Sequence, residues 1–181
     1  MKRALRKEIL DKRNRMKKED IIKKSRGIRE KLFLMPEFMN SKTIAFYISF
    51  GSEVFTHSMI KELLGKKRIL APKTTDNEII FSEIGDFNEL KPGKFNILEP
   101  VDIKEADHNK IDLIIVPGIV FDKKGHRIGY GYGFYDKLLK KINCKKIGLA
   151  FSLQIVDKIP KEDYDVAVDK IVTEEEVINC R

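Results

Sequence analysis

The chain has 181 residues, with 36 Lys and Arg against 28 Asp and Glu, so its formal net charge is +8 at pH 7. A chain of this length can bury about 70% of its unfolded surface without a disulfide or a structural metal, and we expect one domain over residues 1–181. Its 42% hydrophobic and 35% charged residues exclude a disordered, collagen-like or membrane-embedded protein.

Two amphipathic helices are expected first, at about residues 2–17 and 19–35. The positions that follow helical spacing are Leu5, Ile9 and Met16 in the first helix and Ile21, Ser25, Ile28 and Leu32 in the second. We expect these stripes to dock on the core and leave the Lys and Arg side chains in solvent.

The positive charge is concentrated in these helices. Residues 1–31 hold 14 basic and 5 acidic side chains, and the rest of the chain holds 22 and 23. Such an arm can attract nucleic acid, an acidic membrane or an anionic small molecule. It has no aromatic side chain before Phe33 for base stacking, and no helix-turn-helix, RNP or zinc-finger motif. Lys2 and Arg6 share one helix face and could bind one anion together.

Strands and helices alternate in the middle of the chain. Strands are expected at Thr43–Ile48, Arg68–Ala71 and Glu78–Ile84. A helix is expected over Thr56–Leu64, with Thr56 as its N-cap. Turn-forming residues predict irregular backbone from about residue 88 to residue 109.

The most clearly marked strand is Asp112–Val116, whose lack of polar alternation is typical of a parallel strand covered on both faces. A helix over Tyr135–Ile142 and strands over Lys146–Ala150 and Asp169–Val172 follow. This alternation predicts an α/β fold, a three-layer α/β/α sandwich with a mostly parallel central sheet and two N-terminal helices. Ligands gather at the carboxyl ends of such strands, so the loops after Ile48, Ala71, Val116 and Ala150 are expected to form the site.

The densest chemical signal is the glycine-rich segment Arg127–Asp136, RIGYGYGFYD. Its alternate glycines allow backbone N–H groups to approach a ligand, and the helix that follows favours phosphate at its N-terminus. Arg127 suits phosphate oxygens, and Asp136 suits a hard cation such as Mg²⁺. The segment matches neither a Walker A motif nor G-x-G-x-x-G. A plain glycine-rich turn with packed aromatic side chains is the alternative.

Other ligand classes find little support. Cys144 and Cys180 form no C-x-x-C motif, and the three histidines have no metal-binding spacing. No apolar run approaches the about 18 residues that span a bilayer, and the N-terminus does not resemble a secretory signal. We expect a cytoplasmic protein with no membrane or nucleic-acid partner.

The segment Pro117–Leu139, PGIVFDKKGHRIGYGYGFYDKLL, resembles the 5-formyltetrahydrofolate cyclo-ligase family. Every fixed element of the family's P-G-x-x-F-D…G-x-R-x-G-x-G-x-G-[YF]-Y-D block is present. The family's K-x-x-x-R is Lys2 to Arg6, its strand and turn run from Ile48 to Glu53, and its tail is Gly148–Glu175.

The resemblance implies an ATP- and Mg²⁺-dependent conversion of 5-formyltetrahydrofolate to 5,10-methenyltetrahydrofolate, with release of ADP and phosphate. Phosphoryl transfer to the formyl oxygen would create a leaving group, and attack by N10 would close the ring. The partner is then a small folate, and the basic helices could hold a polyglutamate tail. We expect a monomer.

The resemblance also implies residue roles. The catalytic residues would be Lys2, Arg6 and Arg127, and Asp136 and Asp165 would bind Mg²⁺. The ATP-binding residues would be Lys2, Arg3, Ala4, Leu5, Arg6, Arg127, Ile128, Gly129, Tyr130, Gly131, Tyr132, Gly133, Phe134 and Tyr135. The folate-binding residues would be Ile48, Glu53, Tyr130, Gly131, Tyr132, Gly133 and Phe134.

Several assignments stay open. Glu53 and Asp165 could be surface acids, Asp122 could cap a turn, and Gln154 is a weaker ligand candidate. Lys73 stands where many family members have Arg, and loses bidentate geometry. Tyr132 replaces a common Gly or Lys, and its ring could reshape the folate entrance. Two other functions remain: a basic RNA-binding module using residues 1–31, and a sugar-phosphate or CoA-handling enzyme of similar fold.

Overall fold

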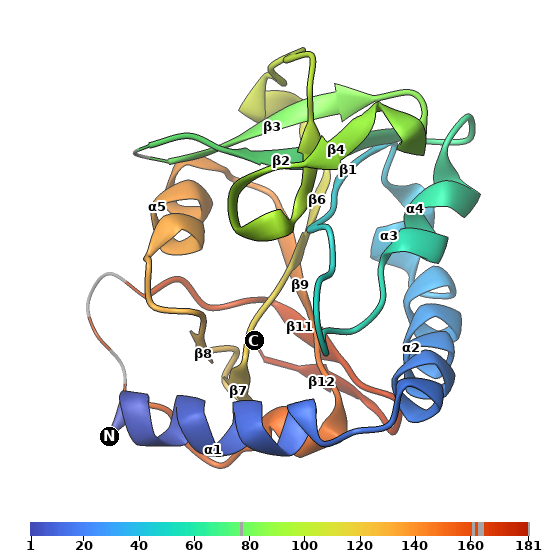
Figure 1. The fold of residues 1–181 in the computed structure, drawn as a ribbon. Coiled ribbons are helices and arrows are strands. Elements are labelled where there is room, and N and C mark those ends of the chain that lie inside the picture. Colours follow the sequence, from blue (N-terminus) through green and yellow to red (C-terminus); the bar gives the residue numbers. More distant parts are fainter. Residues whose placement is uncertain (77, 161, 163–164, 181) are drawn as a thin grey trace.

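A mostly parallel sheet organises the computed structural model, which describes residues 1–76, 78–160, 162 and 165–180. Within these residues the main sheet has seven strands in the order β12-β11-β9-β6-β1-β2-β3 (Figure 1). The neighbours from β11 to β2 are parallel, and the edge strands β3 and β12 are antiparallel. The strand bounds are β1 Thr43–Ala45, β2 Arg68–Thr74, β3 Ile79–Ile84, β6 Leu113–Val116, β9 Lys145–Leu149, β11 Lys170–Val172 and β12 Val177–Asn179. The predicted α/β class and mostly parallel sheet are confirmed.

Helices lie on both faces of this sheet because both faces are apolar. Alternate residues of a strand point to opposite faces, so Ile44 packs in one buried cluster and Ala45 in another. The first cluster contains side chains of α2 (Lys18–Phe33), α3 (Pro36–Asn40) and α4 (His57–Leu63). The second contains side chains of α5 (Phe134–Lys141). No helix in the described ranges is long and apolar enough to cross a membrane.

The first helix, α1 (Lys2–Asn14), crosses the end of the sheet where β6 leads into β7 (Val120–Asp122) (Figure 1). Its Ile9 packs in a third buried cluster with Ile119, Val120, Ile128 and Ile159. In α2, Ser25, Ile28 and Leu32 are buried. The predicted docking of both apolar stripes is confirmed, and it places the start of α1 beside the loops at the carboxyl ends of the strands.

Short elements complete the fold. Strands β10 (Ile155–Val156), β7 and β8 (Arg127–Ile128) form a small sheet, and β4 (Leu90–Pro92) pairs with β5 (Leu98–Pro100). Within the described residues, four 3-10 turns cover Phe87–Glu89, Lys94–Asn96, His108–Lys110 and Ser152–Gln154. These pairings and β12 are not predictable from the sequence, because strands of two or three residues show no periodicity.

The structure corrects three element predictions. Strand β1 ends at Ala45 rather than Ile48, although Phe46 N still donates to Leu70 O at 3.0 Å. Strand β2 runs past its predicted end at Ala71 to Thr74. Its pairing with β1 ends at Leu70, but its pairing with β3 continues through Pro72 to Thr74. Thr56 does occupy the N-cap position of α4, but its side chain makes no capping hydrogen bond: its hydroxyl donates to Tyr47 O at 2.9 Å and accepts from Ser49 N at 3.0 Å.

Candidate active site

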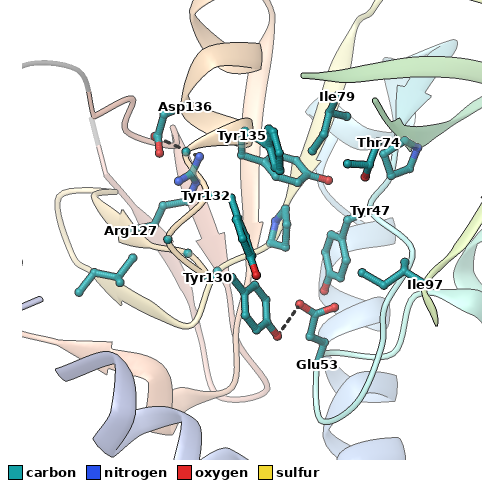
Figure 2. A pocket seen from close by; sticks show the side chains of 18 of the residues that line it. Tyr47, Glu53, Thr74, Ile79, Ile97, Arg127, Tyr130, Tyr132, Tyr135 and Asp136 are labelled. Atoms are coloured by element: carbon teal, nitrogen blue, oxygen red, sulfur yellow. Dashed lines mark hydrogen bonds and ion pairs between the residues drawn. The ribbon is translucent and has the colours of Figure 1, made fainter. Parts of the chain in front are cut away.

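A cavity of about 500 Å³ lies where the glycine-rich loop, the start of α1, the loop after β1 and the β4–β5 hairpin meet (Figure 2). Most of the predicted site residues line it, namely Lys2, Arg6, Ile48, Glu53, Asp136, Asp165 and every residue from Arg127 to Tyr135. Segments from both ends of the chain therefore meet at one site.

Three predicted residues do not bring their side chains to the cavity. Arg3 and Ala4 are exposed to solvent. Leu5 packs against the buried cluster that contains Ile9. They occupy other faces of the helix that carries Lys2 and Arg6, so adjacency in sequence does not place them at the site.

The glycine-rich loop depends on backbone conformations that favour glycine. Gly131 has φ +104° and Gly133 has φ +70°, and Gly133 is the left-handed residue just before α5. A Cβ at Gly129 or Gly133 would meet no atom within 4 Å. Gly133, Phe134 and Tyr135 line the cavity, so the start of α5 with its free N–H groups lies beside it, which favours an anion.

Arg127 enters the cavity wall from β8 with a side chain only 3% exposed. Its Nη2 lies 3.2 Å from Asp136 Oδ1, yet neither Nε nor Nη2 makes a hydrogen bond within the described residues. Burial lowers the pKa of Arg127, and the charge of Asp136 opposes that shift. A buried guanidinium with unused donors is suited to the oxygens of a phosphate.

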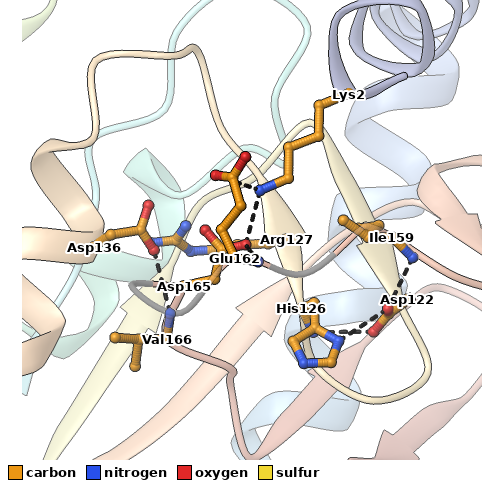
Figure 3. Close-up of polar contacts among 9 residues, drawn as sticks. All are labelled: Lys2, Asp122, His126, Arg127, Asp136, Ile159, Glu162, Asp165 and Val166. Carbon is orange, nitrogen blue, oxygen red and sulfur yellow. Dashed lines mark hydrogen bonds and ion pairs between the residues drawn. The ribbon is translucent and has the colours of Figure 1, made fainter.

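Asp136, Glu162 and Asp165 lie beside Arg127 (Figure 3). Lys2 Nζ donates to Asp165 Oδ2 at 2.8 Å and lies 3.0 Å from Glu162 Oε2. Burial alone would raise the pKa of Asp165, but the hydrogen bonds from Lys2 and the Glu162 amide lower it overall. No group of three or more His, Cys, Asp or Glu side chains in the described ranges could hold a metal ion. Mg²⁺ commonly uses one or two carboxylates with substrate phosphates, so Asp136 and Asp165 fit that mode.

Glu53 forms the polar group at another side of the cavity (Figure 2). It is buried, and it accepts from Phe50 N at 3.1 Å and from the Tyr130 hydroxyl at 3.2 Å. Burial raises the pKa of Glu53 to about 7, although the charge of Arg13 and these two hydrogen bonds oppose the shift. A surface position for Glu53 is thereby excluded.

Thr74 lies in the wall just beyond Ala71, in a segment that the sequence predicted for the site. Other parts of the wall were not anticipated, among them Ile79, Phe95, Ile97 and Glu99. The Tyr132 ring lies 5.3 Å from the Phe95 ring and 5.9 Å from the Phe134 ring. This half-exposed aromatic group comes partly from the β4–β5 hairpin, in a segment predicted to be irregular, and no local motif signals it.

Lys73, Asp122 and Gln154, whose roles the sequence left open, have structural partners. Lys73 Nζ lies 3.1 Å from Glu99 Oε2. Asp122 accepts from the backbone N–H groups of Lys124, His126 and Ile159, each at 3.0 Å, so it shapes the turn between β7 and β8. Gln154 is buried and donates to Gly118 O at 2.9 Å and Ile119 O at 3.0 Å. Gln154 thus supports the cavity wall at Gly118 without lining it.

The fold and the site define an α/β enzyme with a two-part small-molecule cavity, one part built for an anion and the other around a buried carboxylate. A family model described as the 5-formyltetrahydrofolate cyclo-ligase family matches residues 1–174. The chain belongs to this family, and the enzyme is a ligase.

Curated relatives and solved structures agree with this assignment. The 5-formyltetrahydrofolate cyclo-ligase of Mycoplasma pneumoniae is 34% identical, over 96% of this chain and 99% of the relative. The mouse 5-formyltetrahydrofolate cyclo-ligase is 28% identical, over 96% and 94%. The NMR structure of Aquifex aeolicus 5,10-methenyltetrahydrofolate synthetase has a TM-score of 0.92 and 36% identity, covering 99% of this chain and 93% of that one. The predicted family is confirmed.

Proposed function

We propose that this ligase converts 5-formyltetrahydrofolate to 5,10-methenyltetrahydrofolate, using ATP and Mg²⁺ and releasing ADP and phosphate. The names of its relatives support the folate substrate. The observation that carries the proposal is the shared cavity, where Arg127 with its unused donors and the buried Glu53 line one space of about 500 Å³. Two substrates of different chemistry can meet there.

The phosphate part of the site would use three cations and the start of α5. Arg127 offers two unused donor nitrogens, and Arg6 lies over the loop with its Nε donating to Gly129 O at 2.7 Å. Lys2 is already balanced by Asp165 and Glu162. Asp136 and Asp165 would hold Mg²⁺, which supplies charge neutralisation for the transferring phosphoryl group.

The folate part of the site would use Glu53 and the apolar side chains around it. A carboxylate accepts hydrogen bonds from the ring and amino N–H groups of a pterin, and Ile48 supplies apolar contact in the same wall. Because these N–H donors bind the ionised form, folate binding would lower the pKa of Glu53 from about 7.

The chemistry asks the protein for positioning rather than for a nucleophile. The formyl oxygen of 5-formyltetrahydrofolate takes the γ-phosphoryl group, and ADP is released. N10 then attacks the formyl carbon and loses its proton, and the C–O bond breaks as phosphate departs. Arg127, Arg6 and Lys2 stabilise the charge on the phosphoryl oxygens, and Glu53 fixes the ring that carries N5.

An absorbance assay tests the proposal directly. Purified protein is mixed with 5-formyltetrahydrofolate and MgATP, and the near-ultraviolet band of the methenyl product is followed, with matched samples lacking ATP or Mg²⁺. We expect product only in the complete mixture and a loss of at least about 100-fold in Arg127→Gln. A folded protein that binds both ligands and forms no product would contradict the proposal.

A further inference from the structure

We propose that Arg13 is a positioning residue for the folate part of the site, acting through the Tyr130 hydroxyl on Glu53. This inference rests on the proposed function. The amphipathic pattern of α1 predicts that Arg13 is solvated like the other Lys and Arg side chains of this helix, and the structure contradicts that prediction. Arg13 is 1% exposed and is among the largest fully buried side chains of the protein.

Arg13 joins three loops that each contribute to the cavity. Its Nε donates to Ser52 Oγ at 3.0 Å, in the loop after β1 that carries Glu53. Its Nη2 donates to the Tyr130 hydroxyl at 2.8 Å, in the glycine-rich loop. Its Nη1 has a longer contact of 3.4 Å to Gly118 O, in the loop after β6. The three nitrogens of one guanidinium therefore set the spacing between the phosphate part and the folate part of the site.

The contact with Tyr130 also sets the direction of the next hydrogen bond. A tyrosine hydroxyl has one proton, and it uses a lone pair to accept from Arg13. Its proton is then available for Glu53 Oε1, 3.2 Å away, as Figure 2 shows for the Tyr130–Glu53 pair. Glu53 is thereby presented as an acceptor, which is the form that the N–H donors of a pterin require.

Charge balance supports the same role. A buried guanidinium is costly unless a negative group compensates it, and Arg13 has no ion-pair partner within 4.0 Å among the described residues. The nearby acid is Glu53, one hydroxyl away, and the charge of Arg13 favours its ionised form. Three tyrosine hydroxyls also face Glu53, those of Tyr47 after β1, Tyr130 in the glycine-rich loop and Tyr135 in α5. The charge of Glu53 helps to raise the pKa of each, and Tyr130 alone among them donates a hydrogen bond to it within the described residues.

Matched variants separate positioning from mere stability. Arg13→Lys keeps the charge and loses the fork, and Arg13→Gln keeps hydrogen bonding and loses the charge. The control is Arg15→Gln, an exposed arginine two residues further along. At pH 7 we expect Arg13→Gln to raise KM for 5-formyltetrahydrofolate about tenfold. KM for ATP and the control should change by less than about twofold. The pH midpoint of folate KM should move upward in Arg13→Gln and stay near wild type in Arg13→Lys.

A ligand-free measurement keeps this inference independent of the proposed function. Infrared titration follows the C=O band of the protonated Glu53 carboxyl, assigned with Glu53→Gln, in wild type and Arg13→Gln. We expect the titration midpoint to rise in Arg13→Gln.

If that variant does not fold, Tyr130→Phe replaces it, with the same expected direction because one donor to Glu53 is lost. An unchanged midpoint and unchanged folate KM, or equal losses for both substrates with an unchanged pH profile, would overturn the positioning role. An inactive wild type with the expected infrared shift would refute the proposed function alone.

Discussion

The most informative perturbation is Arg127→Met, because it should weaken function and stabilise the unliganded protein. Arg127 is buried with two donors that find no acceptor in the described part of the chain, and burial lowers its pKa. Such an arrangement is unfavourable until an anion fills the cavity. Methionine has similar length and no polar group to satisfy.

The expected magnitude follows from the contacts of Arg127. A buried donor without a partner costs about 1–3 kcal/mol, and Arg127 has two of them. The ion pair with Asp136, whose side chain is 24% exposed, offsets about 1 kcal/mol. The Tyr135 ring, 6.0 Å from the guanidinium carbon, offsets about 0.5 kcal/mol. We therefore expect Arg127→Met to raise the unfolding free energy by about 0.5–4.5 kcal/mol, and Tm by about 2–4 °C per kcal/mol.

Calorimetry with and without MgATP tests this reasoning. The control is Arg68→Met, an exposed arginine paired with Glu83, whose Tm should change by less than about 2 °C. MgATP should raise the Tm of wild type and of Arg68→Met by mass action, and leave that of Arg127→Met unchanged. A lower Tm in unliganded Arg127→Met, together with a wild-type response to MgATP, would refute the role of the unused donors.

Three further predictions concern stability. The pKa of Glu53 is raised from 4.5 to about 7, so the unfolding free energy should fall by up to about 3 kcal/mol as pH rises from 4.5 to 7. Urea unfolding at stepped pH should show a flatter fall in Glu53→Gln. The same pH dependence of the unfolding free energy in wild type and Glu53→Gln would exclude a buried Glu53 carboxylate. Gly133→Ala should cost about 1–2 kcal/mol by calorimetry because of its positive φ, whereas Gly129→Ala should be near neutral; equal losses would contradict the loop geometry. Asp122→Ala should lower the unfolding free energy by about 3 kcal/mol, since it removes the acceptor of three backbone N–H groups; a loss below about 1 kcal/mol in urea unfolding would contradict this structural role.

The sequence predicted the elements whose formation depends mainly on neighbouring residues in the chain. The apolar run Asp112–Val116 predicted a central parallel strand, and β6 at Leu113–Val116 is buried throughout. The glycine-rich segment predicted a loop before a helix, and Gly133 does precede α5 in a left-handed conformation. The two-residue strand β8 left no such pattern, since its pairing with β7 depends on the turn that Asp122 organises.

The site could be predicted only where a motif marked it. The resemblance named Lys2, Arg127 and Asp165, which the fold brings to one cavity from opposite ends of the chain. Arg13 looked like any charged residue of α1, because its burial arises from the packing of three distant loops. Phe95 was equally invisible, since it reaches the cavity on a hairpin within a segment without periodicity.

Oxygen tracing tests most directly the claim that ATP and folate meet in this cavity. 5-Formyltetrahydrofolate labelled with ¹⁸O in the formyl group is turned over with MgATP, and the released phosphate is analysed by mass spectrometry. Direct phosphoryl transfer to the formyl oxygen predicts one ¹⁸O atom in each phosphate formed with the methenyl product. Product formed with unlabelled phosphate and ¹⁸O in water would contradict the account.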